Sequence, residues 1–165
     1  MSRLRSILFI IALALAGCES PSYVYRYVPG KTAALEGGCA IAPPQAPPPV
    51  LQAIAAGNRI AGSGYARGGG HGGELDGRFD CSGATSYVLR AAGLLADSMP
   101  STGFRRYGAS GLGEWISVYA RRGHVFLVVA GLRFDTGWNG EGSGPRWTMR
   151  NRPAPGAVIR HPPAL

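Results

Sequence analysis

Residues 78–89, with the sequence RFDCSGATSYVL, decide how the rest of this chain is interpreted. From Cys81 onward, small and apolar residues recur at three- and four-residue steps, which predicts a helix with one buried face. The residues that follow Cys81 on this face are Ala84, Val88, Ala91 and Leu95. Asp80 suits the N-cap of this helix, and Gly93 suits its end.

The predicted helix places Cys81 in its first turn. The positive end of the helix dipole favours the thiolate there, and the thiolate is the nucleophilic form of cysteine. Backbone N–H groups left unpaired at the same helix end can stabilise an oxyanion. The competing interpretation is that Cys81 is a small buried apolar residue, as most cysteines are.

A second motif favours the catalytic interpretation. His124 stands near the start of residues 123–131, GHVFLVVAG, which predict a strongly apolar strand. Cys81 and His124 are far apart in the sequence, as a nucleophile and a base brought together by folding usually are. The two residues therefore form a candidate catalytic pair.

Strand geometry supplies a candidate for the group that orients the base. If residues 130 and 131 form a two-residue hairpin turn, Val129 pairs with Leu132. Phe126 then lies opposite Asp135, and His124 is the diagonal neighbour on the same face. A carboxylate there fixes the imidazole tautomer and stabilises the imidazolium.

Two alternatives to this role of Asp135 remain open. In the first, Asp135 only caps the strand end or pairs with an arginine. In the second, a one-residue change in the turn places Asp135 on the opposite face. His71, in a glycine loop that leads toward the same helix end, is then the next candidate. If Asp135 orients the base, Asp135→Ala is expected to lower turnover by a few orders of magnitude with little loss of stability.

Composition allows one modest domain with appendages, since the chain has 165 residues and 45% apolar content. A formal net charge of +8 suits an anionic setting such as a cell-wall polymer or a phospholipid surface. The arginines are scattered and no recognition motif for DNA or RNA is present, so we expect no nucleic-acid partner. No His, Cys or carboxylate pair has zinc-site spacing, so no metal or cofactor is expected.

The first 17 residues predict a secretion signal. Arg3 and Arg5 form its basic start, and residues 7–16 form an apolar run too short to span a bilayer. Residues 15–18, LAGC, resemble the lipobox of bacterial lipoproteins, which implies cleavage before Cys18 and acylation of its side chain. An ordinary signal peptide with a chance cysteine is the alternative.

Acylation at Cys18 determines where the chain is expected to lie. Two or three acyl chains give stable anchoring, so we expect a lipid-anchored protein on the periplasmic side of the cell envelope. Glu19 is not the aspartate that favours inner-membrane retention, so placement in the outer membrane is favoured.

Residues 18–49 are expected to form a tether. The proline-rich residues 43–49 favour an extended, semi-rigid spacer. Alternating tyrosines from Tyr23 to Tyr27 fit either a short strand packed on the domain or a contact with the membrane surface. Cys39 has no obvious disulfide partner, and a bridge to Cys81 is the structural alternative.

Residues 50–61 predict a helix that precedes the helix of Cys81. The residues expected to pack on the domain are Leu51, Ile54, Ala55 and Ala61. The glycine-rich residues 62–71 lack the features of a phosphate-binding loop. Their glycines are expected to let the backbone pass close to the helix of Cys81.

Several of these motifs, in this order, resemble the NlpC family of papain-like cysteine peptidases, which cut peptidoglycan. They are Tyr65, the glycines at 68–70, residues 80–83 (DCSG) and residues 123–125 (GHV). The similarity covers roughly residues 50–136. It implies an α+β, papain-like domain over residues 50–165, with N-terminal helices packed on a small antiparallel sheet.

The resemblance also implies a role for each matched residue. Cys81 is the nucleophile, His124 is the base, Tyr65 sits beside the oxyanion, and Asp80 and Ser82 lie near the substrate amine. The chemistry is thiolate attack on an amide carbon, thioester formation and hydrolysis. The implied partners are peptidoglycan peptides, and we expect the chain to act as a monomer.

Two departures from the family pattern leave substrate specificity open. Residues 113–119, GEWISVY, stand where the family usually has Pro-Gly-Asp-Leu-Val, and Asp135 stands where it usually has His, Asn or Gln. The sequence thus predicts a cell-wall hydrolase that cleaves amide bonds in stem peptides. The alternatives are an amidase or acyltransferase on the same fold, and an inactive wall-binding lipoprotein whose cleft only holds peptide.

Overall fold

The computed structural model describes residues 20–72, 77–137 and 144–165. The predicted signal sequence 1–17, the predicted acylation site Cys18, and Glu19 lie outside the described residues. Within the described ranges, no helix has both the length and the apolar character needed to cross a membrane.

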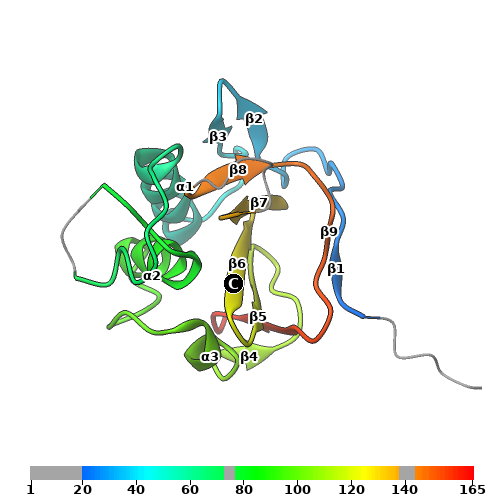
Figure 1. Ribbon diagram of the computed structural model, residues 1–165. Coiled ribbons are helices and arrows are strands. Elements are labelled where there is room, and N and C mark those ends of the chain that lie inside the picture. The colour runs from blue at the N-terminus through cyan, green and yellow to red at the C-terminus, as the bar shows by residue number, and fades with distance from the viewer. Residues whose placement is uncertain (1–19, 73–76, 138–143) are drawn as a thin grey trace, which may run out of the picture.

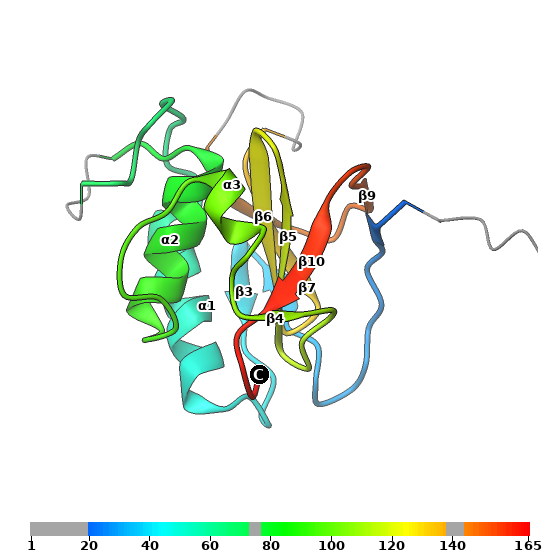
Figure 2. The ribbon, with the colours of Figure 1, turned by 90° about the horizontal axis from the view of Figure 1, so that it is seen from below.

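The centre of the described fold is a six-stranded antiparallel sheet with strand order β4-β10-β5-β6-β7-β8. Its strands are β4 (Ala109–Ser110), β5 (Ile116–Arg121), β6 (His124–Val129), β7 (Leu132–Asp135), β8 (Arg146–Thr148) and β10 (Val158–His161). The helices are α1 (Pro48–Ile60), α2 (Cys81–Ala91) and the single turn α3 (Ser101–Phe104). Figure 2 shows α1 and α2 together on one side of this sheet. The α+β class predicted from the sequence is confirmed.

Strand β6 divides the core into two faces. Val125, Leu127 and Val129 are fully buried in the main core, with residues of the helices. Phe126 points to the other face, where it belongs to a smaller cluster with Tyr23 and Tyr119. Side chains alternate along a strand, so His124 shares the face of Phe126.

The first turn of α2 is built as the sequence predicted. The side chain of Asp80 accepts a hydrogen bond from the Gly83 N–H at 2.7 Å, which is the N-cap interaction. Gly93, with φ of +71°, follows the end of the helix. A Cβ atom placed on Gly83 would lie 2.0 Å from the Gly69 carbonyl oxygen, so the glycine loop does pass directly against α2.

The buried face of α1 differs from the one predicted. Ile54 is buried as expected, but Leu51 and Ala55 are exposed. The helix presents Gly57 to the core, where a Cβ atom would lie 2.4 Å from the ring of Trp147. Close approach of this tryptophan turns the buried face toward Gly57 and away from Leu51.

The hairpin of β6 and β7 has the predicted register. Val129 pairs with Leu132, and Ala130 and Gly131 between them both have positive φ, of 46° and 74°. Positive φ at both central residues defines the turn type that matches the twist of two-residue hairpins. The Ala33 N–H donates to the Ala130 carbonyl at 2.8 Å, so the N-terminal segment contacts this turn.

The segment expected to form a tether packs on the body of the protein from residue 20 onward. Strand β1 (Ser22–Tyr23) pairs with β9 (Arg152–Pro153) on the side of the sheet opposite the helices (Figure 1). Tyr23 is buried, and its hydroxyl donates to the Gly131 carbonyl at 2.8 Å. Of the two interpretations of the alternating tyrosines, Tyr23 supports the short packed strand.

The next part of the same segment packs beside α1. Strands β2 (Ala34–Glu36) and β3 (Cys39–Ile41) form a small hairpin. Asn58 of α1 accepts from the Ala40 N–H at 2.8 Å and donates to its carbonyl at 2.9 Å. Cys39 and Cys81 are both free thiols, so the alternative bridge between them is not formed.

Candidate active site

The start of α2 and the start of β6 meet at a cavity of about 240 Å³. Its lining comprises Tyr65, Cys81, Gly123, His124, Thr136, Gly137 and Arg152. The fold therefore brings together three residues that the sequence singled out: the predicted nucleophile, the predicted base and the tyrosine.

His124 is held by the carboxylate of Asp135. Its Nε2 lies 2.8 Å from Asp135 Oδ1. Because a carboxylate only accepts hydrogen bonds, this nitrogen carries the proton and donates. Cys81 lines the same cavity as His124 and lies close enough to raise the pKa of the imidazole. This contact between His124 and Asp135 is the one that the hairpin register predicted.

The surroundings of His124 favour its charged form. Burial by itself would lower the pKa of His124, because it disfavours the imidazolium. Hydrogen bonds to Asp135 and Cys81, with the negative charge that both can carry, outweigh this and raise the pKa above its ordinary value of 6.5. An imidazolium beside a thiolate is the ion pair that activates a catalytic cysteine.

Asp135 has more partners than the histidine. Its side chain is completely buried, and it accepts hydrogen bonds from the Thr136 N–H at 2.8 Å and from Arg152 Nη1 at 2.8 Å. Arg133 Nε lies 3.8 Å from the same carboxylate, within ion-pair distance. Asp135 thus pairs with arginines, which was one of the alternatives to a role beside the base, and it also contacts His124.

The two arginines lie among aromatic rings. Arg133 is fully buried, with its guanidinium carbon 5.8 Å from the ring centre of Tyr23 and 5.9 Å from that of Phe126. Burial lowers the pKa of Arg133 to about 10, and the charge of Asp135 opposes this shift. The guanidinium of Arg152 lies 5.4 Å from the Phe126 ring centre. Sequence reasoning missed Arg152, because one arginine in a distant segment carries no local signal.

A second polar cluster surrounds Asp80 at the start of α2. Besides the Gly83 N–H, the carboxylate accepts from the Gly68 N–H at 2.9 Å and from the Ser82 hydroxyl at 3.0 Å. Burial by itself would raise the pKa of Asp80, but these hydrogen bonds and the nearby His71 lower it below its ordinary value. Asp80 is therefore held as an anion beside Cys81.

His71 belongs to this second cluster. Its Nε2 lies 3.2 Å from Asp80 Oδ1 and 3.1 Å from Ser82 Oγ, while its Nδ1 lies 2.6 Å from Ser98 Oγ. Both ring nitrogens are thereby occupied. Asp135 and His71 were the two candidates for the residue that orients His124. Of these two described residues, Asp135 is in contact with His124 and His71 is not.

Tyr65 is placed to act as a donor at the mouth of the cavity. The residue is 45% exposed. Burial of its hydroxyl, followed by the charges of Cys81 and Asp80, raises the pKa of Tyr65. The phenol therefore keeps its proton and can donate a hydrogen bond to an oxyanion.

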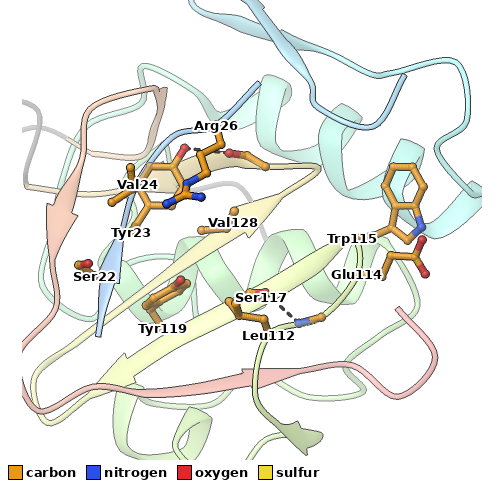
Figure 3. Close-up of a pocket in the computed structure, with 12 residues that line it drawn as sticks. Ser22, Tyr23, Val24, Arg26, Leu112, Glu114, Trp115, Ser117, Tyr119 and Val128 are labelled. Atoms are coloured by element: carbon orange, nitrogen blue, oxygen red, sulfur yellow. Dashed lines mark hydrogen bonds between the residues drawn. The ribbon is translucent and has the colours of Figure 1, made fainter. Parts of the chain in front are cut away.

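Three larger cavities lack this pairing of cysteine and histidine. One of about 500 Å³ lies on the face of the sheet opposite the helices and is lined by residues that include Tyr23, Trp115 and Tyr119 (Figure 3). Another of about 530 Å³ lies beside α3. Neither is lined by a cysteine or a histidine. The third, of about 300 Å³, is lined by Cys39 but by no histidine, so the smaller cavity at Cys81 is the better candidate for catalysis. Within the described ranges, no cluster of three or more His, Cys, Asp or Glu residues is arranged to hold a metal ion.

Comparison of the chain with protein-family models, with curated proteins and with solved structures returns no match.

Proposed function

We propose that this protein is a cysteine hydrolase that cleaves amide bonds in the peptides of the bacterial cell wall. The observation that carries the proposal is the placement of Cys81 and His124 in one cavity, with His124 hydrogen-bonded to Asp135. The three residues come from α2, β6 and β7, and they stand in the order nucleophile, base and orienting carboxylate.

The reaction proceeds through a thioester. The Cys81 thiolate attacks the amide carbon, and the negative charge moves to the carbonyl oxygen. Backbone N–H groups at the start of α2 and the Tyr65 hydroxyl stabilise this oxyanion. His124 gives its proton to the departing amine as the carbon–nitrogen bond breaks. His124 then takes a proton from water, which attacks the thioester, releases the carboxylic acid and restores the thiol.

The cell-wall substrate rests on the resemblance to the NlpC family, and two features of the site support it. A cysteine at a helix start that meets a histidine at a strand start suits the papain-like arrangement which the resemblance implies. Asp80, held as an anion beside Ser82, is suited to receive the amine of a peptide substrate.

Attachment to the envelope is part of the proposal. Acylation of Cys18 would hold the protein at the membrane beside the wall, with the outer membrane favoured by Glu19. Mass spectrometry of the wild type is expected to show lipid on Cys18, and Cys18→Ser is expected to leave the precursor uncleaved or differently processed. A wild type that carries no lipid and is soluble in the periplasm would contradict this part.

Hydrolysis is tested by incubating the full chain with defined muropeptides and weighing the products. The wild type is expected to release two fragments, and Cys81→Ser and His124→Ala are expected to fold and to release almost none. Peptide that binds without being cut, together with a Cys81 thiol that is inert to an active-site probe, would instead indicate a wall-binding protein. Transfer of the acyl group to an acceptor other than water would indicate an acyltransferase.

A further inference from the structure

The cavity of about 530 Å³ beside α3 carries a concentration of positive charge. It is lined by Pro100, Thr102, Gly103, Arg105, Arg106 and Arg122. Three of these side chains are cationic and none is acidic. Guanidinium groups gathered around one hollow repel each other unless an anion lies between them.

Among the described residues, none forms an ion pair or a side-chain hydrogen bond with these three arginines. Arg106 and Arg122 are exposed, and no ion pair joins either to a described residue. The Nε atom of Arg105 is buried and has no hydrogen-bond partner within the part of the chain that the structure describes. By contrast, Arg160 donates to the carbonyl oxygens of Tyr107 and Gly108, each at 2.7 Å. The arginine pocket, defined as Arg105, Arg106 and Arg122, therefore keeps donors for a ligand.

The arginine pocket adjoins the candidate active site. Arg122 lines the pocket, and the next two residues, Gly123 and His124, line the cavity of Cys81. The two cavities therefore share the turn between β5 and β6. A peptide that occupies the cavity of Cys81 can extend over this turn and reach the arginines.

We propose that the arginine pocket binds a carboxylate of the same peptide whose amide bond lies at Cys81, a proposal that rests on the proposed function. The planar guanidinium matches a carboxylate with two parallel hydrogen bonds. Phosphate has the same chemistry. The carboxylate of the peptide is favoured because the pocket shares a turn with the cavity where that peptide is cut.

Binding of a matched pair of probes tests the proposal. The full chain carrying Cys81→Ser is titrated calorimetrically with a defined muropeptide that has free carboxylates and with its carboxamide counterpart. The carboxylate form is expected to bind about tenfold more tightly, as charge-assisted hydrogen bonds at a partly exposed site should give. Arg105→Gln with Arg122→Gln is expected to reduce this preference to about twofold or less.

Arg26→Gln supplies the matched control for charge. Arg26 is exposed on the N-terminal segment and lines the cavity on the opposite face of the sheet, so its removal changes net charge alone. This variant is expected to retain the full preference. The single variant Arg122→Gln, at an exposed turn position, tests the pocket even if the double variant fails to fold, and a loss of at least threefold in the preference is expected.

Four results would overturn the proposal. The first is equal binding of the two peptides by the parent, and the second is a preference that survives both Arg122→Gln and the double variant. The third is an equal loss of preference in Arg26→Gln. The fourth is that inorganic phosphate or anionic lipid vesicles bind the arginines and displace neither form of the peptide. Hydrolysis without carboxylate preference would remove this inference and leave the hydrolase. Preference without hydrolysis by the wild type would remove the hydrolase and leave the anion site.

Discussion

Replacing Asp135 by alanine is expected to damage both stability and catalysis. The carboxylate is completely buried and faces Arg152 at 2.8 Å, Arg133 at 3.8 Å and His124 at 2.8 Å. Its removal leaves buried positive charge without this counter-charge, which typically costs about 3–5 kcal/mol. This loss is a large share of the roughly 5–15 kcal/mol by which domains are stable. The expectation from the sequence, that stability would hardly change, is revised because both arginines are buried.

Thermal unfolding followed by circular dichroism measures the effect. For a chain of this size, 1 kcal/mol corresponds to about 2–4 °C, so the midpoint should fall by roughly 6–20 °C. The control is Glu114→Ala, which removes an ion pair with Lys31 whose side chains are 63% and 53% exposed. That pair should be worth about 1 kcal/mol or less. Equal midpoints for Asp135→Ala and the wild type would refute the buried charge cluster.

Asp135→Asn separates stability from catalysis. Asparagine keeps the volume and one hydrogen-bond acceptor, so it should unfold closer to the wild type than alanine does. It no longer stabilises the imidazolium of His124, so turnover on muropeptides should still fall by at least about a hundredfold. A folded Asp135→Asn variant with wild-type turnover would show that Asp135 is structural and does not act on the base.

Three further outcomes are expected. The pKa of His124 is raised, and its imidazolium is lost as pH rises through that pKa, so kcat/KM should fall on the alkaline side of its pH profile. Asp135→Asn should move this alkaline fall to lower pH. Because the pKa of Asp80 is lowered by folding, its ionised side chain adds stability above about pH 3.8, and this stability is lost as pH falls through the pKa of the folded state. Asp80→Ala should therefore lower the free energy of unfolding by about 0.5–2 kcal/mol at neutral pH and by less in acid. Gly83→Ala should lose more than about 2 kcal/mol in urea unfolding, because its Cβ would lie 2.0 Å from the Gly69 carbonyl oxygen.

Local chemistry explains what the sequence predicted correctly. An N-cap is made by a side chain and a backbone N–H three residues apart, so Asp80 and the start of α2 follow from a short stretch. The hairpin turn at residues 130 and 131 fixes the register of both strands, and the contact of Asp135 with His124 follows by counting. Such features depend on neighbours along the chain.

Long-range packing explains what the sequence did not predict. Whether Leu51 or Gly57 faces the core depends on Trp147, which lies 90 residues further along the chain than Gly57. The proline-rich composition near residue 45 suggested a spacer, yet Tyr23 and Ala40 find partners on the folded body. Composition reports the average preference of a segment and does not record which surface is available to cover it.

The N-terminal segment and the candidate site are linked through Arg152. This arginine lines the cavity of Cys81. Burial lowers the pKa of Arg152 overall, and the charges of Asp135 and Cys81 oppose part of this shift. Arg152 therefore brings positive charge within electrostatic reach of the sulfur, in addition to that of His124. Arg152 belongs to β9, whose partner in the two-stranded sheet is β1. The first described strand thus supports the backbone that places Arg152 in the cavity of Cys81, which gives residues 20–24 a role in the site that a tether would not have.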